Sequence, residues 1–260
     1  MRSKRRFNGV LGGLCLLMLL ALPLFSMADD NSSLYAQGNA AYTKGQYQQA
    51  ANDYQKIVDA GYQSVEVYFN LGNAYYRLGD IPSAILYYEK AHKLAPSDED
   101  VNFNIHYANA RTSDKLEQAP EFFVTKWWEG FILFFSVNTL AVLSILCMLG
   151  GCAVLILYLF TNSFVVKRSS FYAGIVGILL GIVFVFMANQ QERYFAGHQQ
   201  AIIFGNSVTA KSTPDANGKP LFIVHEGTKV NVLQQNDTWM EVELPNGNAG
   251  WIAVTDAKDI

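Results

Sequence analysis

The sequence predicts a multidomain membrane protein with three parts: an α-helical repeat array, a two-helix transmembrane hairpin and a small all-β domain. The 260 residues are 51% hydrophobic and 16% charged, whereas soluble domains carry about 25% charged residues. A 34-residue period runs through the first part of the chain, and short alternating strands separated by Gly, Asn and Pro fill the last part. Together these observations disfavour a wholly soluble protein and a disordered one.

The N-terminal residues 1–28 have the pattern of a signal peptide. Basic residues precede the apolar stretch Val10–Leu22, and Ser26-Met27-Ala28 is a small-x-small cleavage site. The alternative is an anchor helix that is not cleaved. Both interpretations predict that the region after residue 28 is exported.

Two further apolar segments, 137–161 and 170–190, are long enough to be transmembrane helices, since about 20 residues cross the hydrocarbon core. The loop 162–169 between them contains Lys167 and Arg168 and no acidic residue. The positive-inside rule therefore predicts a cytoplasmic loop. It follows that both soluble regions are periplasmic and that the protein lies in the bacterial inner membrane. Neither span contains a charged residue, which argues against a channel or transporter.

Small residues are expected where the two spans meet. Gly174, Gly177 and Gly181 form a stripe on the second span that would let its backbone approach Gly150 and Gly151 of the first. The alternative is that these glycines only reflect the high frequency of glycine in membrane helices.

Residues 119–136, ahead of the first span, combine many aromatic residues with a few charged ones. This composition is typical of an amphipathic helix at the membrane interface, with Trp127 and Trp128 at the depth of the lipid headgroups. The alternative is that the segment only extends the first span.

Residues 31–64 and 65–98 are two copies of one pattern. Gly38, Ala50 and Tyr54 recur 34 residues later as Gly72, Ala84 and Tyr88, and each copy has two helical patterns separated by a glycine turn. The second copy resembles the tetratricopeptide repeat at each of its signature positions, which are Leu71, Gly72, Tyr75, Gly79, Ala84, Tyr88, Ala91 and Pro96. A third, partial copy after Asp98 is interpreted as a capping helix, so that the array covers residues 29–118.

This resemblance implies an α-helical solenoid whose concave face binds extended peptides. The residues expected on that face are Tyr35, Asn39, Tyr42, Phe69, Asn70, Asn73, Tyr76, Asn104 and Tyr107. Asparagine side chains would hold a peptide backbone through paired donor and acceptor hydrogen bonds. Tyr35, Asp100 and Asn104 stand where repeats that bind a terminal carboxylate have basic residues, which argues against such a ligand. The alternative is that the tyrosines and phenylalanines belong to the core between the helices.

Residues 197–260 resemble a bacterial SH3-like barrel. The resemblance rests on Val208–Pro214, on His225-Glu226-Gly227-Thr228, on Trp239 and on the segment Gly247–Ile252. Glycines at 227, 247 and 250 suit turns or bulges. Trp239 and Trp251 are the candidate ligand-binding surface of this domain, and the alternative is that both are packing residues.

No catalytic or metal-binding pattern is present in the sequence. The three cysteines, at 15, 147 and 152, lie inside apolar runs, and the four histidines lack metal-ligand spacing. We therefore expect a non-enzymatic protein without a cofactor or metal. The net charge of −3 and the absence of a basic surface argue against nucleic acid as a partner.

The order of the parts along the chain resembles the BatE family of the bacterial aerotolerance (Bat) operon. That resemblance implies an envelope protein that works beside von Willebrand A-type membrane proteins and a MoxR-type ATPase, with a role in aerotolerance or stress resistance. The resulting hypothesis is a membrane-anchored periplasmic adaptor, or scaffold, for protein–protein interaction, with envelope proteins and the lipid bilayer as partners. The alternative is a cell-wall sensor that binds peptidoglycan through the SH3-like domain.

Overall fold

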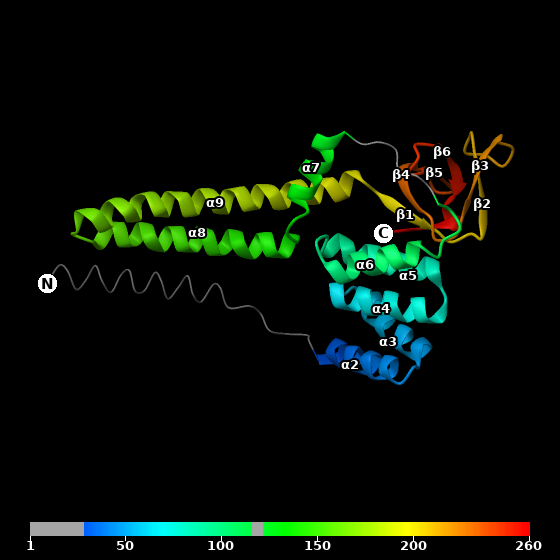
Figure 1. The fold of residues 1–260 in the computed structure, drawn as a ribbon, viewed down its shortest axis with the longest axis horizontal. Helices are drawn as coiled ribbons and strands as arrows, with labels where there is room; N and C mark the ends of the chain where they lie inside the picture. Colours follow the sequence, from blue (N-terminus) through cyan, green and yellow to red (C-terminus); the bar gives the residue numbers. More distant parts are fainter. Residues whose placement is uncertain (1–28, 116–121) are drawn as a thin grey trace.

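The structure, a computed structural model, describes residues 29–115 and 122–260 (Figure 1). The predicted signal peptide, residues 1–28, lies outside the described residues, as does the segment 116–121. A helical array, a long helical hairpin and a β-sheet follow one another along the chain. The array and the sheet lie at the same end of the hairpin (Figure 1).

The helical array consists of α2 to α6, which stack as antiparallel neighbours (Figure 1). Their bounds are Asp29–Thr43 for α2, Tyr47–Asp59 for α3, Val65–Leu78 for α4, Ile81–Leu94 for α5 and Glu99–Asn109 for α6. Ser64, Asp80 and Asp98 cap α4, α5 and α6 by accepting a hydrogen bond from a backbone N–H of the first turn. Gly45 and Gly79 have positive φ angles of 76° and 84°, so they allow the chain to reverse between paired helices.

Contacts between glycine and tyrosine hold the two helices of each repeat together. A Cβ atom at Gly38 would lie 2.5 Å from the ring of Tyr54, and one at Gly72 would lie 2.6 Å from the ring of Tyr88. Both rings are buried. The same contact thus occurs in both copies of the sequence pattern, and it requires a residue without a side chain in the first helix.

Helix α7, Phe123–Ile132, is separate from α8, Val137–Phe160. The helices are divided at Leu133–Ser136, and Ser136 begins α8 by accepting a hydrogen bond from the Thr139 N–H. The aromatic segment before the first predicted span therefore forms a helix of its own. Most of its large aromatic side chains are exposed, Trp127 by 68%.

Helices α8 and α9 pack as an antiparallel hairpin (Figure 1). Helix α9 extends from Phe164 to Gly197, so the loop predicted at 162–169 is wrong in extent and is limited to residues 161–163. No glycine or proline occurs between 164 and 170 to interrupt the helix. In length and apolar composition both helices could cross a membrane, and few of their residues are buried, which is compatible with membrane association.

The expected small-residue contact joins α8 and α9. A Cβ atom at Gly151 would lie 2.8 Å from the carbonyl oxygen of Gly174, and one at Gly177 would lie 3.1 Å from the Cα atom of Gly151. A Cβ atom at Gly181 would lie 3.1 Å from the carbonyl oxygen of Ser144. The expectation for Gly150 is wrong, because no described atom outside its own helix lies within 4 Å of a Cβ atom built there.

Residues 200–260 form the β-module, a single antiparallel sheet with the strand order β3-β2-β6-β5-β4-β1-β7. The strands are β1 Gln200–Ile203, β2 Ser207–Lys211, β3 Pro220–His225, β4 Lys229–Gln235, β5 Trp239–Glu243, β6 Ala249–Ala253 and β7 Ala257–Asp259, and the short 3-10 helix η1, Val254–Asp256, precedes β7. Its core contains Ile203, Val224, Met240, Val242 and Ile252.

The prediction of a barrel is wrong in one respect, because the sheet of the β-module is not closed. The edge strands β3 and β7 are at opposite ends of the strand order and do not pair with each other. Strand β7 has only three residues, and Pro220 of β3 lacks the N–H that a paired strand would donate. Both features work against an additional ladder that would close the sheet.

Candidate functional site

The predicted concave face is carried by α2, α4 and α6, the first helices of successive units. The nine candidate side chains are all at least partly exposed. Asn70 of α4 contacts α2, since its Nδ2 donates to the Tyr35 hydroxyl at 3.0 Å. Tyr76 of α4 contacts α6, since its ring centroid lies 5.5 Å from that of Tyr107. The structure therefore brings candidates from three helices together, whereas the ring of Tyr42 contacts Tyr47 of α3, with centroids 5.2 Å apart.

The asparagines among these candidates form a hydrogen-bond network that repeats from one unit to the next. Asn39 Oδ1 accepts from the Tyr54 hydroxyl at 2.7 Å and from Asn70 Nδ2 at 3.3 Å. Asn73 Oδ1 accepts in the same way from the Tyr88 hydroxyl at 2.7 Å and from Asn104 Nδ2 at 3.1 Å. Burial raises the pKa of Tyr54 to about 12, so this phenol remains a neutral donor.

The network changes what the asparagines can offer a ligand. Both lone pairs of the Oδ1 atoms of Asn39 and Asn73 are used inside the array. Their Nδ2 groups make no hydrogen bond to any residue that the structure describes, so they remain available to donate to the carbonyl groups of a peptide. Asn39 and Asn73 can therefore offer a ligand only a donor, and not the paired donor and acceptor that the sequence predicted.

Phe103 of α6 lies beside the predicted residues although it was not among them. It follows Tyr35 and Phe69 at the same 34-residue interval, and that interval was the signal that could have identified it. Its ring is 67% exposed and stacks on Tyr107, with centroids 6.1 Å apart and planes 8° apart. Arg111 places its guanidinium 5.4 Å from the ring centroid of Tyr76 at the same end of the face.

Some of these aromatic residues belong partly to the core between the helices, which was the alternative interpretation of the sequence. Tyr35 and Tyr42 pack partly against the buried cluster of the first unit, and Phe69 and Tyr76 pack against that of the second. Phe103 and Tyr107, which is 56% exposed, are not among the residues of either cluster. The α6 end of the face therefore offers the largest accessible aromatic surface of the candidate groove.

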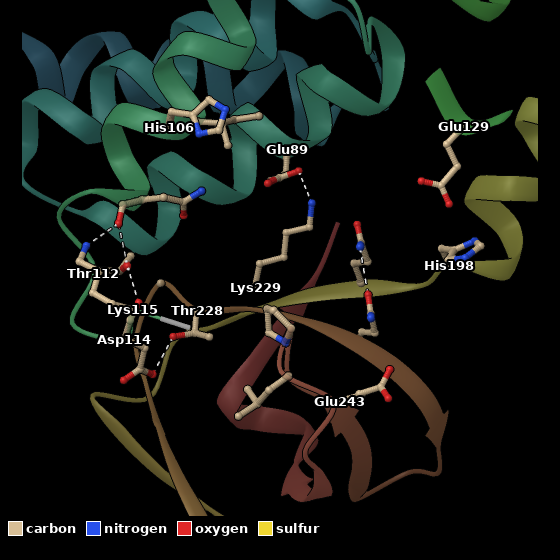
Figure 2. Close-up of a pocket in the computed structure, with 18 of the residues that line it drawn as sticks. Glu89, His106, Thr112, Asp114, Lys115, Glu129, His198, Thr228, Lys229 and Glu243 are labelled. Atoms are coloured by element: carbon tan, nitrogen blue, oxygen red, sulfur yellow. Dashed lines mark hydrogen bonds and ion pairs between the residues drawn. The ribbon is translucent and has the colours of Figure 1, made fainter. Parts of the chain in front are cut away.

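A second concave region lies where the array, α7, the end of α9 and the β-module meet (Figure 2). This interdomain cleft has a volume of about 900 Å³. Its charged lining residues are Glu89, Asp114, Lys115, Glu129, Lys229 and Glu243. The cleft could not be predicted from the sequence, because these side chains come from separate segments of the chain. Among residues 29–115 and 122–260, no three His, Cys, Asp or Glu side chains are grouped to hold a metal ion.

Two charged contacts cross this cleft from the helical side to the β-module (Figure 2). Lys229 Nζ lies 2.7 Å from Oε2 of Glu89, whose side chain is only 5% exposed. Asp114 accepts hydrogen bonds from the His225 N–H at 2.8 Å, from His225 Nδ1 at 2.7 Å and from the Thr228 hydroxyl at 2.9 Å. Burial of Asp114 opposes its ionisation, but these hydrogen bonds outweigh that effect and lower the pKa of Asp114.

The lowered pKa of Asp114 predicts a pH-dependent contribution to stability. A carboxyl group whose pKa is lower in the folded state stabilises the fold above its unfolded pKa, about 4, and this contribution is lost as the pH falls through the folded value. Denaturant unfolding of the wild type and of Asp114→Asn should therefore differ most at pH 7, and the difference should shrink at pH 3. A difference that stays constant between these pH values would contradict the assigned cause.

Comparison with known proteins identifies the repeats. Residues 35–99 match the tetratricopeptide repeat family. The helical array contains tetratricopeptide repeats. These repeats indicate a role in protein–protein interaction. No curated protein matches the chain.

Two solved structures resemble parts of the chain. A tetratricopeptide repeat protein from Bacteroides fragilis NCTC 9343 is 14% identical, with a TM-score of 0.29, and the match covers 65% of this chain and 79% of that one. An NlpC/P60 family protein from Bacillus cereus ATCC 10987 is 21% identical, with a TM-score of 0.21, and the match covers 28% of this chain. The chain spans about a quarter of the length of that second protein, 23%.

Proposed function

We propose that this protein is a membrane-anchored periplasmic adaptor that binds an extended segment of another envelope protein on the concave face of its tetratricopeptide array. The observation that carries the proposal is one row of side chains on the array. It contains the amide groups of Asn39 and Asn73 and, on α6, exposed aromatic rings. Those Nδ2 groups would donate to backbone carbonyls, and Phe103 and Tyr107 would contact apolar side chains of the partner. The nine predicted side chains and Phe103 are uncharged, and a cation, Arg111, lies beside them with its guanidinium 5.4 Å from the ring centroid of Tyr76.

Anchoring by the α8–α9 hairpin is supported by three features. Both helices are long and apolar, and their outward-facing side chains are exposed. Helix α7 carries exposed aromatic side chains, including Trp127 and Trp128, as an interfacial helix would. Lys167 and Arg168 lie near the turn that is remote from the array and the sheet (Figure 1). This placement fits a cytoplasmic turn with both soluble parts in the periplasm.

The order of the parts supports the narrower proposal that the partners are von Willebrand A-type membrane proteins and that the process is aerotolerance or stress resistance. An adaptor held in the same membrane as its partner meets it at a high effective concentration. A groove with modest intrinsic affinity would then be sufficient for a stable complex.

The test is crosslinking in intact membranes with the double variant Phe103→Ala/Tyr107→Ala, followed by identification of the captured envelope proteins. We expect at least a tenfold loss of the captured partner, because the main exposed aromatic surface of the groove is removed. Leu78→Ala is the matched control, since Leu78 is also an exposed apolar residue of the array, 41% exposed, but ends α4 beside the repeat turn.

Folding of the double variant should be unchanged, since both rings are more than half exposed. Capture of the same proteins at wild-type levels would overturn the groove assignment. Loss of capture with Trp251→Ala, but not with the double variant, would instead assign partner binding to the β-module.

A further inference from the structure

Among the residues that the structure describes, no second helix follows α6 to complete the third unit of the tetratricopeptide array. Helix α6 corresponds to the first helices α2 and α4, and in the two complete units a second helix, α3 or α5, follows. After α6 the chain instead leads through Thr112–Lys115 toward α7. An array that ended here would expose the apolar side of α5 and α6 where the next helix would pack, and solenoids need a terminal cap to cover such a surface.

Strand β1 of the β-module covers this surface. Alternate residues of a strand point to opposite faces, and Ala201 and Ile203 lie in the core of the β-module. Ile202, between them, is fully buried in the core of the array together with Ala84, Ile85, Leu86, Tyr88 and Ala108. Phe204 and Ile260 of the β-module pack against the same cluster.

Polar contacts surround this apolar contact. Asp114, in the segment after α6, binds the turn that contains His225 and Thr228, and Lys229 pairs with the buried Glu89 of α5. Lys93 Nζ, also on α5, donates to the carbonyl oxygen of Ile260 at 3.1 Å. A Cβ atom at Gly227, where φ is 82°, would lie 2.9 Å from Thr112 Cγ2, so the turn of the β-module touches the segment after α6.

We infer that the β-module is the C-terminal cap of the tetratricopeptide array and occupies the place where a second helix of the third unit would pack. Helix α6 carries Phe103, Asn104 and Tyr107, so the cap supports the helix at the end of the candidate groove. The cap lies beyond α9 in the chain, and the array lies before α7. The contact between them therefore joins the segments that precede and follow the α8–α9 hairpin. The stability of the array would then depend on the β-module, which follows the hairpin in the chain.

The experiment is hydrogen–deuterium exchange on the full-length protein, comparing Ile202→Asp with Ile223→Asp. Both substitutions put a carboxylate on the β-module, but Ile202 is buried against the array whereas Ile223 is 57% exposed on edge strand β3. We expect the amides of α6 to exchange at least tenfold faster in Ile202→Asp, with those of α2 and α3 unchanged. Ile223→Asp should leave the exchange of α6 at the wild-type rate.

A second variant keeps the inference testable if Ile202→Asp disturbs the β-module itself. Asp114→Ala removes three hydrogen bonds to the turn from a residue outside the sheet, so the core of the β-module is untouched. It should accelerate exchange in α6 several-fold while β4 and β5 stay protected. Wild-type exchange of α6 in both variants would overturn the inference, and so would acceleration of equal size in Ile223→Asp.

Discussion

Replacing Gly151 with leucine should destabilise the α8–α9 hairpin by about 3 kcal/mol, the upper part of the range for overpacking a close contact. A Cβ atom at this position would lie 2.8 Å from the carbonyl oxygen of Gly174 and 3.0 Å from the backbone nitrogen of Ile178. Backbone atoms inside a helix cannot move aside as a flexible side chain can. The two helices would have to separate, and the contacts along their length would weaken.

The neighbouring residue provides the control for this experiment. Gly150→Leu adds the same side chain one position earlier, where no described atom outside its own helix lies within 4 Å. Resistance of the detergent-solubilised protein to denaturant and to proteolysis between α8 and α9 should fall for Gly151→Leu and remain at the wild-type level for Gly150→Leu. Equal behaviour of the two variants would show that the close contact at Gly151 does not hold the hairpin together.

Gly72→Val should destabilise the tetratricopeptide array by about 3 kcal/mol. The Cβ atom would lie 2.6 Å from Cδ1 of Tyr88, a ring that is 2% exposed and is tied to Asn73 by its hydroxyl group. The ring cannot swing away without breaking that hydrogen bond. We therefore expect α4 and α5 to move apart and the second unit to lose its packing.

The measurement for Gly72→Val is thermal unfolding followed by circular dichroism. Ala40→Val is the matched control, because it places the same β-branched residue at an exposed position of α2 and costs only the small difference in helix propensity. A clear fall in the midpoint temperature is expected for Gly72→Val alone. A similar fall in both variants would mean that valine acts through helix propensity and not through the contact with Tyr88.

Local patterns in the sequence were sufficient to place most elements of the fold. The 34-residue spacing of Gly38, Gly72 and their tyrosine partners identified paired helices, because each contact is made within one repeat. The alternation of polar and apolar residues indicated short strands in the last part of the chain, and β2 shows this alternation in its burial. The predicted span 170–190 is shorter than α9, Phe164–Gly197. Apolar composition identifies only the segment that could lie in lipid. The helix continues beyond that segment until a residue or a contact ends it.

The candidate groove was also predicted only in part from the sequence. The repeat period placed the nine predicted residues on one face, and applied once more it would have added Phe103. It could not reveal that Asn39 and Asn73 use their carbonyl oxygens inside the array. That depends on where Tyr54 and Tyr88 direct their hydroxyl groups after the helices have packed.

The sequence by itself determined the repeats, the two long apolar helices, the glycine turns and most of the strands, because each depends on residues that are close together in the chain. Only the tertiary structure decided that the sheet stays open, that Ile202 is buried in the array and that Asp114 meets His225, which is 111 residues away. Such contacts depend on how completed elements fit against one another. No local pattern of residues carries that information.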